Sequence, residues 1–194
     1  MIYRHCQDWL ETAHYRSIDY RWVSREHISP DASLAVIAGE DQNFFQHAGF
    51  DLPSIQTAWA NYQRGRSLRG ASTISQQLAK NLFLNPSKTA IRKISEAWFT
   101  VILENVWDKA RILETYLNIA EFGDHIFGIE AASQHYFGIS AEQLNRNQAA
   151  LLAATLPNQL MLHADHPSAY LNKRKQWILQ QMQNLGDLSK LQRQ

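Results

Sequence analysis

Glu40 is the first candidate for catalysis, in the stretch GEDQNFFQHAGFD at residues 39–51. On a helix, Glu40, Phe44 and His47 would fall at positions i, i+4 and i+7 and share one face. An apolar ring beside the Glu40 carboxylate would exclude water and raise its pKa, which suits a general base near neutral pH. The simpler alternative is that Glu40 and Asp41 are solvated while His47 caps the end of the helix. The local stretch leaves both interpretations of Glu40 open.

Glu96 is a second carboxylate, and it ends a long run without acids. No Asp or Glu lies between residues 52 and 95, a segment that holds seven of the 19 lysines and arginines. Elsewhere 12 cations face 18 acids, although the net charge is only +1. The seven cations are Arg64, Arg66, Arg69, Lys80, Lys88, Arg92 and Lys93. A basic face without a partner usually includes acids for i,i+4 pairing, so this segment is expected to meet a polyanion, a phosphate or an anionic lipid surface.

Arg92 and Lys93 precede Glu96 by four and three residues. One interpretation of this spacing is an ordinary helix salt bridge. Because Glu96 stands at the edge of the basic segment, it could instead orient both cations toward a phosphate.

A polar stripe runs along the helix expected at residues 72–84. Thr73, Gln77 and Lys80 fall at positions i, i+4 and i+7. Such stripes most often face solvent, but a hydroxyl, an amide and an ammonium in line also suit a phosphate and a sugar. Together with Glu40 and Glu96, they are the parts of a group-transfer site.

Other chemistries have little support in the sequence. Metal-ligand spacing is absent, since His163 and His166 stand in a loop before Pro167. No glycine-rich phosphate loop or serine nucleophile elbow is present. The single Cys6 excludes an internal disulfide, and no apolar run approaches the ~18 residues of a membrane span.

Hydrophobic spacing, caps and breakers predict one all-α domain. Helices are expected at residues 28–45, 51–63, 72–84, 87–107, 108–123, 128–138, 141–156 and 166–186. Residues 1–30 are ambiguous, with a short helix to about His14 and then an irregular or extended segment. The stretch RGRSLRG at 64–70 is the most loop-like part of the chain.

The ordered motifs resemble the peptidoglycan glycosyltransferases with a lysozyme-like fold, most closely the monofunctional kind. The family's first motif, Glu-Asp-x-x-Phe-x-x-His-x-Gly-x-Asp, is met in full at residues 40–51. Its second, Gly-Ala-Ser-Thr-Ile-x-Gln-Gln-x-x-Lys-Asn, is met at 70–81. The third is RKISE at 92–96, the fourth ILETYLNIAEFG at 112–123, and the fifth lies in GIEAASQHYFG at 128–138. One motif alone would be weak, but five in order are specific.

The resemblance implies a single lysozyme-like helical domain with a mobile loop near the donor site. Residues 1–194 would form it, with an N-terminal region at 1–30, the catalytic motifs at 40–138 and C-terminal helices at 139–186. The enzyme would polymerise lipid II into β-1,4-linked glycan with inversion, releasing undecaprenyl pyrophosphate. Glu40 would be the general base and Glu96 a second catalytic acid. The implied substrate-binding residues are Asp41, Phe44, His47, Thr73, Gln77, Lys80, Asn81, Arg92 and Lys93.

The resemblance also implies the setting of the reaction. The expected partners are lipid II, the lipid-linked glycan chain, a membrane surface and other cell-wall synthases. Binding to nucleic acid is not expected. The expected location is the periplasmic face of a bacterial inner membrane, with the family's anchor helix missing from this chain. No cofactor is required, although a divalent Mg or Mn ion on the pyrophosphate is left open. The alternatives are a lysozyme-like glycan-cleaving enzyme, a basic helical module that binds nucleic acid, and a catalytically silent scaffold.

Overall fold

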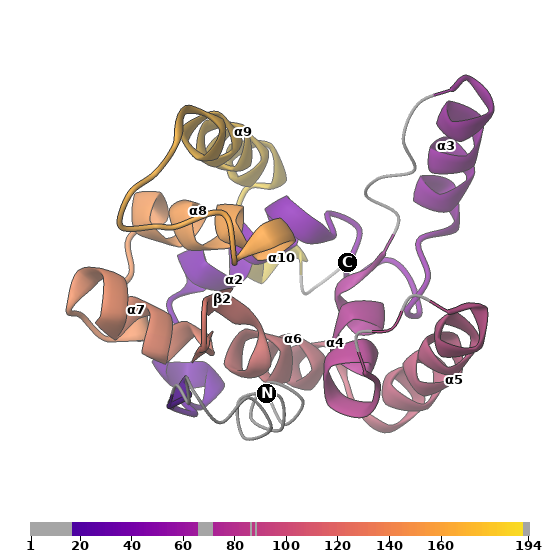
Figure 1. The fold of residues 1–194 in the computed structure, drawn as a ribbon, viewed down its shortest axis with the longest axis horizontal. Coiled ribbons are helices and arrows are strands. Elements are labelled where there is room, and N and C mark those ends of the chain that lie inside the picture. Colours follow the sequence, from indigo (N-terminus) through magenta and orange to yellow (C-terminus); the bar gives the residue numbers. More distant parts are fainter. Residues whose placement is uncertain (1–16, 66–71, 86, 88, 192–194) are drawn as a thin grey trace, which may run out of the picture.

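Helices dominate the computed structural model, which describes residues 17–65, 72–85, 87 and 89–191 (Figure 1). The α-helices are α2 (Pro30–Glu40), α3 (Leu52–Gln63), α4 (Ile74–Phe83), α5 (Ala90–Val106), α6 (Lys109–Ile119), α7 (Ile129–Phe137), α8 (Arg146–Thr155), α9 (Ala169–Leu185) and α10 (Leu188–Leu191). Short 3₁₀ helices are η1 (Arg25–His27), η2 (Ala141–Gln143) and η3 (Leu156–Asn158). The expected all-α class is confirmed. The helix expected up to His14 and most of the loop at 64–70 lie outside the described residues.

Several helices begin and end where their capping residues predict. The Ser29 hydroxyl accepts the backbone N–H of Asp31, with Pro30 in the first turn of α2. Asp108 caps α6 in the same way. Gly138 ends α7 in the left-handed conformation, with φ of 67°.

Three predicted helices are too long. The helix expected at 28–45 ends at Glu40. The helix expected at 108–123 ends at Ile119, because the chain turns there into a strand. The helix expected at 141–156 is two elements. Its predicted Ser140–Gln143 capping box caps only η2, and Asn145 forms a second capping box that starts α8.

A small sheet that the sequence did not predict joins the N-terminal segment to the core. Its strands are β1 (Asp19–Tyr20), β2 (Glu121–Gly123) and β3 (Ile126–Phe127), in the order β1-β3-β2. β1 runs parallel to β3, and β2 runs antiparallel to it. The buried Asn118 side chain on α6 bonds both the N–H and the carbonyl of Val23, at 2.9 Å each. The extended segment predicted after residue 14 is thereby held against α6.

α2 lies at the centre of one half of the molecule, packed on α8 and α9. Residues 32–38 are all buried, as expected of a helix that is apolar all round. In Figure 1, α7, α8 and α9 lie on one side, α3 and α5 on the other, and α4 and α6 between them. Residues of the second, third and fourth motifs lie on α4, α5 and α6, in the middle and on the right of this view, whereas the fifth motif forms α7 on the left.

Among the described residues, no helix has the length and apolarity needed to span a bilayer.

Candidate active site

A cleft of about 1,070 Å³ opens where α2 ends. Glu40, the last residue of α2, lies in its wall, together with Gln77 of α4 and Arg174 of α9. Because α2 ends at Glu40, Phe44 and His47 lie beyond it in an irregular loop. The prediction that these three residues share one helical face is therefore wrong.

Asp41 explains why the helix stops. Its carboxylate accepts the backbone N–H of Ile74, at the start of α4, at 3.0 Å. His47 donates from Nε2 to the same carboxylate at 2.9 Å, and its Nδ1 accepts the N–H of Gly49 at 3.1 Å. The second contact fixes the proton on Nε2. His47 therefore holds the loop at 41–50 closed on Asp41 rather than capping the helix.

Phe44 supports this loop from beneath. Its ring is fully buried, and the Lys109 ammonium lies 4.6 Å from the ring centre. A side chain without exposed surface contributes to the site by fixing the loop, so Phe44 offers no contact surface to a substrate.

Gly49 allows the loop to reach both α4 and α5. Its φ is +86°, a conformation that favours glycine. Thr73, the N-cap of α4, donates its hydroxyl to the Gly49 carbonyl at 2.7 Å. An added Cβ at this position would lie 2.7 Å from the Thr100 methyl carbon.

We expect Gly49→Ala to destabilise the fold by about 1–3 kcal/mol, because a positive φ and a close contact combine at one residue. Denaturant unfolding measures the change. Gly65→Ala is the matched control, since Gly65 also has a positive φ of 75° but no atom of the described residues lies within 4 Å of an added Cβ. Equal losses for the two variants would contradict the proposed close contact.

The Glu40 carboxylate is held at both oxygens by residues from distant parts of the chain. Gln77 Nε2 donates to Oε2 at 2.9 Å, and Arg174 Nη2 donates to Oε1 at 3.1 Å. Tyr116 of α6, itself buried, donates its hydroxyl to Gln77 Oε1 at 2.8 Å. This third bond orients the Gln77 amide so that its N–H groups face Glu40. Three helices thus fix the position of one carboxylate.

Burial raises the pKa of the Glu40 carboxyl above its ordinary value. The hydrogen bonds from Gln77 and Arg174, and the charges of Arg174 and Lys80, act in the opposite direction without cancelling it. The raised pKa predicted from the sequence is confirmed in direction, but its predicted cause, a Phe44 ring on the same helical face, is not. A carboxylate of this kind accepts a proton more readily than a solvated one.

Lys80 links Glu40 to the cluster around Glu96. Burial lowers the pKa of the Lys80 ammonium, and the charges of Glu96 and Glu40 oppose this effect. Buried Glu96 accepts from Arg92 Nη1 at 2.6 Å and also pairs with Lys93. The predicted salt bridge around Glu96 is confirmed, and its two cations add to the lowering of the Lys80 pKa.

The predicted residues divide into four groups. Glu40, Asp41, Thr73 and Gln77 line the cleft. Glu96, Lys80, Arg92 and Lys93 form the neighbouring charged cluster and are not among the cleft-lining residues. Asn81 is exposed, and Phe44 and His47 support the loop. Arg66, Arg69 and Lys88 lie outside the described residues.

Arg174 and Tyr116 are functional candidates that the sequence reasoning missed. Tyr116 lies within the fourth motif, but no role in the site was predicted for it. Arg174 lies 134 positions from its partner Glu40, so no local spacing could have paired them.

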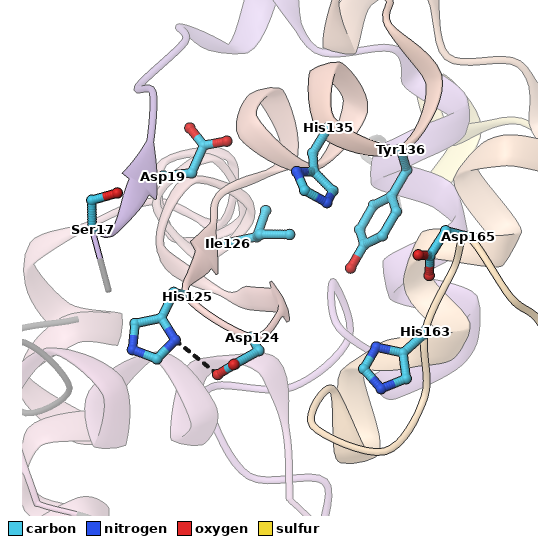
Figure 2. A pocket seen from close by; sticks show the side chains of 9 residues that line it. All are labelled: Ser17, Asp19, Asp124, His125, Ile126, His135, Tyr136, His163 and Asp165. Atoms are coloured by element: carbon cyan, nitrogen blue, oxygen red, sulfur yellow. Dashed lines mark hydrogen bonds and ion pairs between the residues drawn. The ribbon is translucent and has the colours of Figure 1, made fainter. Parts of the chain in front are cut away.

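A second cavity, of about 320 Å³, contains none of the predicted site residues. Figure 2 shows histidines and aspartates around Tyr136, with His125 bonded to Asp124 at 2.8 Å. His163 and Asp165 reach it from the loop that the sequence predicted before Pro167. Within the described part of the chain, no three His, Cys, Asp or Glu side chains are placed to hold a metal ion.

Comparison with known proteins shows the family of this chain. The family model described as Transglycosylase matches residues 8–183. The chain is 55% identical over 172 residues to the biosynthetic peptidoglycan transglycosylase of Shewanella oneidensis, covering 89% of this chain and 74% of that protein. The protein of the same name from Pseudomonas fluorescens is 50% identical over 188 residues, covering 96% and 77%.

The chain belongs to the transglycosylase family. The resemblance seen in the five motifs is confirmed, and with it the expectation of a peptidoglycan glycosyltransferase.

Proposed function

We propose that this transglycosylase polymerises lipid II into β-1,4-linked glycan. Glu40 takes the proton from the acceptor sugar 4-hydroxyl, and the oxygen forms a bond to the anomeric carbon of the lipid-linked donor chain. The bond from that carbon to the pyrophosphate oxygen breaks, and undecaprenyl pyrophosphate leaves with the bonding electron pair. A single displacement of this kind inverts the anomeric configuration.

The observation that carries the proposal is the position of Glu40. Its carboxylate is fixed at both oxygens, has a raised pKa and lies within electrostatic reach of Lys80. A preorganised cation stabilises the negative charge that develops on a departing diphosphate.

We further propose that Glu96 acts indirectly, by positioning the two cations with which it forms ion pairs. Buried Glu96 holds Arg92 and Lys93 in place beside Lys80, where they balance the pyrophosphate charge. Because these residues already supply positive charge, the reaction requires no cofactor. Adding Mg²⁺ or Mn²⁺ to a metal-free assay tests whether a divalent ion on the pyrophosphate increases the rate.

Incubation with labelled lipid II tests the proposed function, with products separated on a gel. A ladder of lengthening glycan supports transfer. Loss of preformed glycan without new polymer would instead support the glycan-cleaving alternative, which uses paired carboxylates without a cation cluster. Lipid II left untouched would support a scaffold, and salt-resistant RNA or DNA binding would support the nucleic-acid module.

Two exposed apolar faces support a membrane surface as the place of reaction. On α5, Ile94 is 70% and Trp98 66% exposed, in a stripe whose spacing of threes and fours would ordinarily be buried. On α3, Trp59 and Tyr62 are more than half exposed, so neither side chain belongs to the buried core. The full α5 stripe comprises Ile91, Ile94, Trp98, Val101, Ile102 and Val106. We propose that these faces enter the interface of the inner membrane at its periplasmic side, where lipid II is anchored.

We expect Ile94→Asp combined with Trp98→Asp to lower binding to anionic vesicles by at least about tenfold, because each change places a charge in the interface. Vesicle co-sedimentation measures it. Trp22→Asp is the control, since Trp22 is also exposed but packs near Arg111 outside the stripe. Unchanged vesicle binding by the α5 double variant would remove α5 from the membrane contact.

A further inference from the structure

The wall of the cleft formed by α9 carries two exposed aromatic side chains. Tyr170, Arg174 and Trp177 fall at positions i, i+4 and i+7 of the helix, and all three line the cleft. Tyr170 is 58% and Trp177 45% exposed. The core-facing side of α9 is formed by other residues, namely Leu171, Ile178 and Met182. The aromatic pair is therefore turned into the cleft and is not part of the core.

Glu40 divides this cleft into two sides. Its Oε2 faces Gln77 of α4, the helix that also carries Lys80, and its Oε1 faces Arg174 of α9. In an inverting displacement the attacking hydroxyl approaches opposite the leaving group. If the diphosphate lies on the side of Lys80, the body of the acceptor lies toward α9.

The chemistry of the α9 wall suits a saccharide. A pyranose ring presents an apolar C–H face that packs on an aromatic ring and an edge of hydroxyl and amide groups that needs polar partners. Tyr170 and Trp177 supply the rings, and Arg174 supplies a polar group between them. Asn158 of η3 adds an amide to the lining of the same cleft. A lipid tail would be a poor occupant beside the Arg174–Glu40 ion pair, because it would bury both charges without replacing their water.

We propose that Tyr170 and Trp177 form a stacking platform for the saccharide of the acceptor, with Arg174 between them holding Glu40 toward the acceptor hydroxyl. The inference rests on the proposed function for its assignment to the acceptor. It assigns individual residues to the acceptor subsite, and these residues lie on a helix outside the five motifs.

Kinetics with separated substrates test the platform. A preformed lipid-linked glycan oligomer is supplied at saturation as donor, and lipid II is varied as acceptor. We expect Trp177→Ala and Tyr170→Ala each to raise the acceptor KM about tenfold, the loss typical of one aromatic contact, with kcat changed less than about twofold. Trp177→Phe and Tyr170→Phe should restore most of the affinity, and Gln176→Ala, an exposed α9 residue outside the cleft lining, should change nothing.

A binding measurement keeps this inference separate from the proposed function. Saturation-transfer NMR with a lipid-free, peptide-free N-acetylated β-1,4 disaccharide should show contact with the wild type and loss of contact in Trp177→Ala. If the wild type made no polymer but still bound the disaccharide through Trp177, the reaction would be wrong and the saccharide site would stand. Alanine variants with unchanged KM, or NMR contact only when a peptide is attached, would overturn the platform.

Discussion

Glu40→Gln should lower the rate of lipid II polymerisation by about 10²- to 10⁴-fold, the range for loss of a general base. Glutamine keeps the size of the side chain, and its single amide oxygen can accept from Gln77 or from Arg174 but not from both. It cannot take a proton from the acceptor hydroxyl. Single-turnover assays with saturating lipid II measure the chemical step directly. Near-normal turnover would remove Glu40 from the role of base.

The stability of the same variant provides its control. A folded-state pKa above the unfolded value means that the folded protein binds the proton more tightly. Stability therefore falls as pH rises from the ordinary glutamate value through the raised pKa, and the cost of the buried charge remains at higher pH. Glu40→Gln removes this cost, so its melting temperature at neutral pH should equal or exceed that of the wild type. A variant that melts several degrees lower would show that inactivity reflects misfolding.

Lys80→Met should lower kcat by about 10²- to 10³-fold, comparable to the loss of one preorganised group that stabilises developing negative charge. Methionine keeps an apolar stem of similar length but removes the cation whose charge interacts with those of Glu40 and Glu96. Because burial lowers the pKa of Lys80, the wild-type rate should also decline at alkaline pH, before the ordinary lysine value is reached.

Lys173→Met is the matched control for charge, since Lys173 is exposed on α9 and is not among the cleft-lining residues. It should leave kcat and the alkaline decline unchanged. If Lys80→Met and Lys173→Met lowered activity equally, general surface charge would explain the effect and the proposed role of Lys80 would be excluded.

Local signals in the sequence predicted the helices well because caps and breakers act over a few residues. Ser29, Asp108 and Gly138 each end or begin a helix as expected. The end of α2 could not be predicted in this way. It depends on Asp41 meeting Ile74, a contact between residues 33 positions apart.

Burial was harder to predict than helix formation. The spacing of Ile94 and Trp98 correctly indicates a helix, yet both side chains are exposed because no other described element covers that face. Periodicity shows that a helix has an apolar side, but it does not say whether protein or lipid meets it.

The functional residues also divide into those that local sequence signals predict and those that only the three-dimensional structure shows. Motif spacing identified Glu40, Lys80 and Glu96, whose electrostatic coupling through Lys80 the structure displays. Arg174 comes from a helix far along the chain and was visible only in three dimensions. Its ion pair with Glu40 depends on the packing of α9 against α2.

The pH dependence of single-turnover polymerisation, compared between the wild type and Glu40→Gln, tests the central claim most directly. In the wild type, the rate should fall tenfold per pH unit on the acid side, with a midpoint above the ordinary glutamate value of 4.5. The residual rate of Glu40→Gln should lack this acid limb. An identical acid limb in both proteins would show that another group accepts the proton.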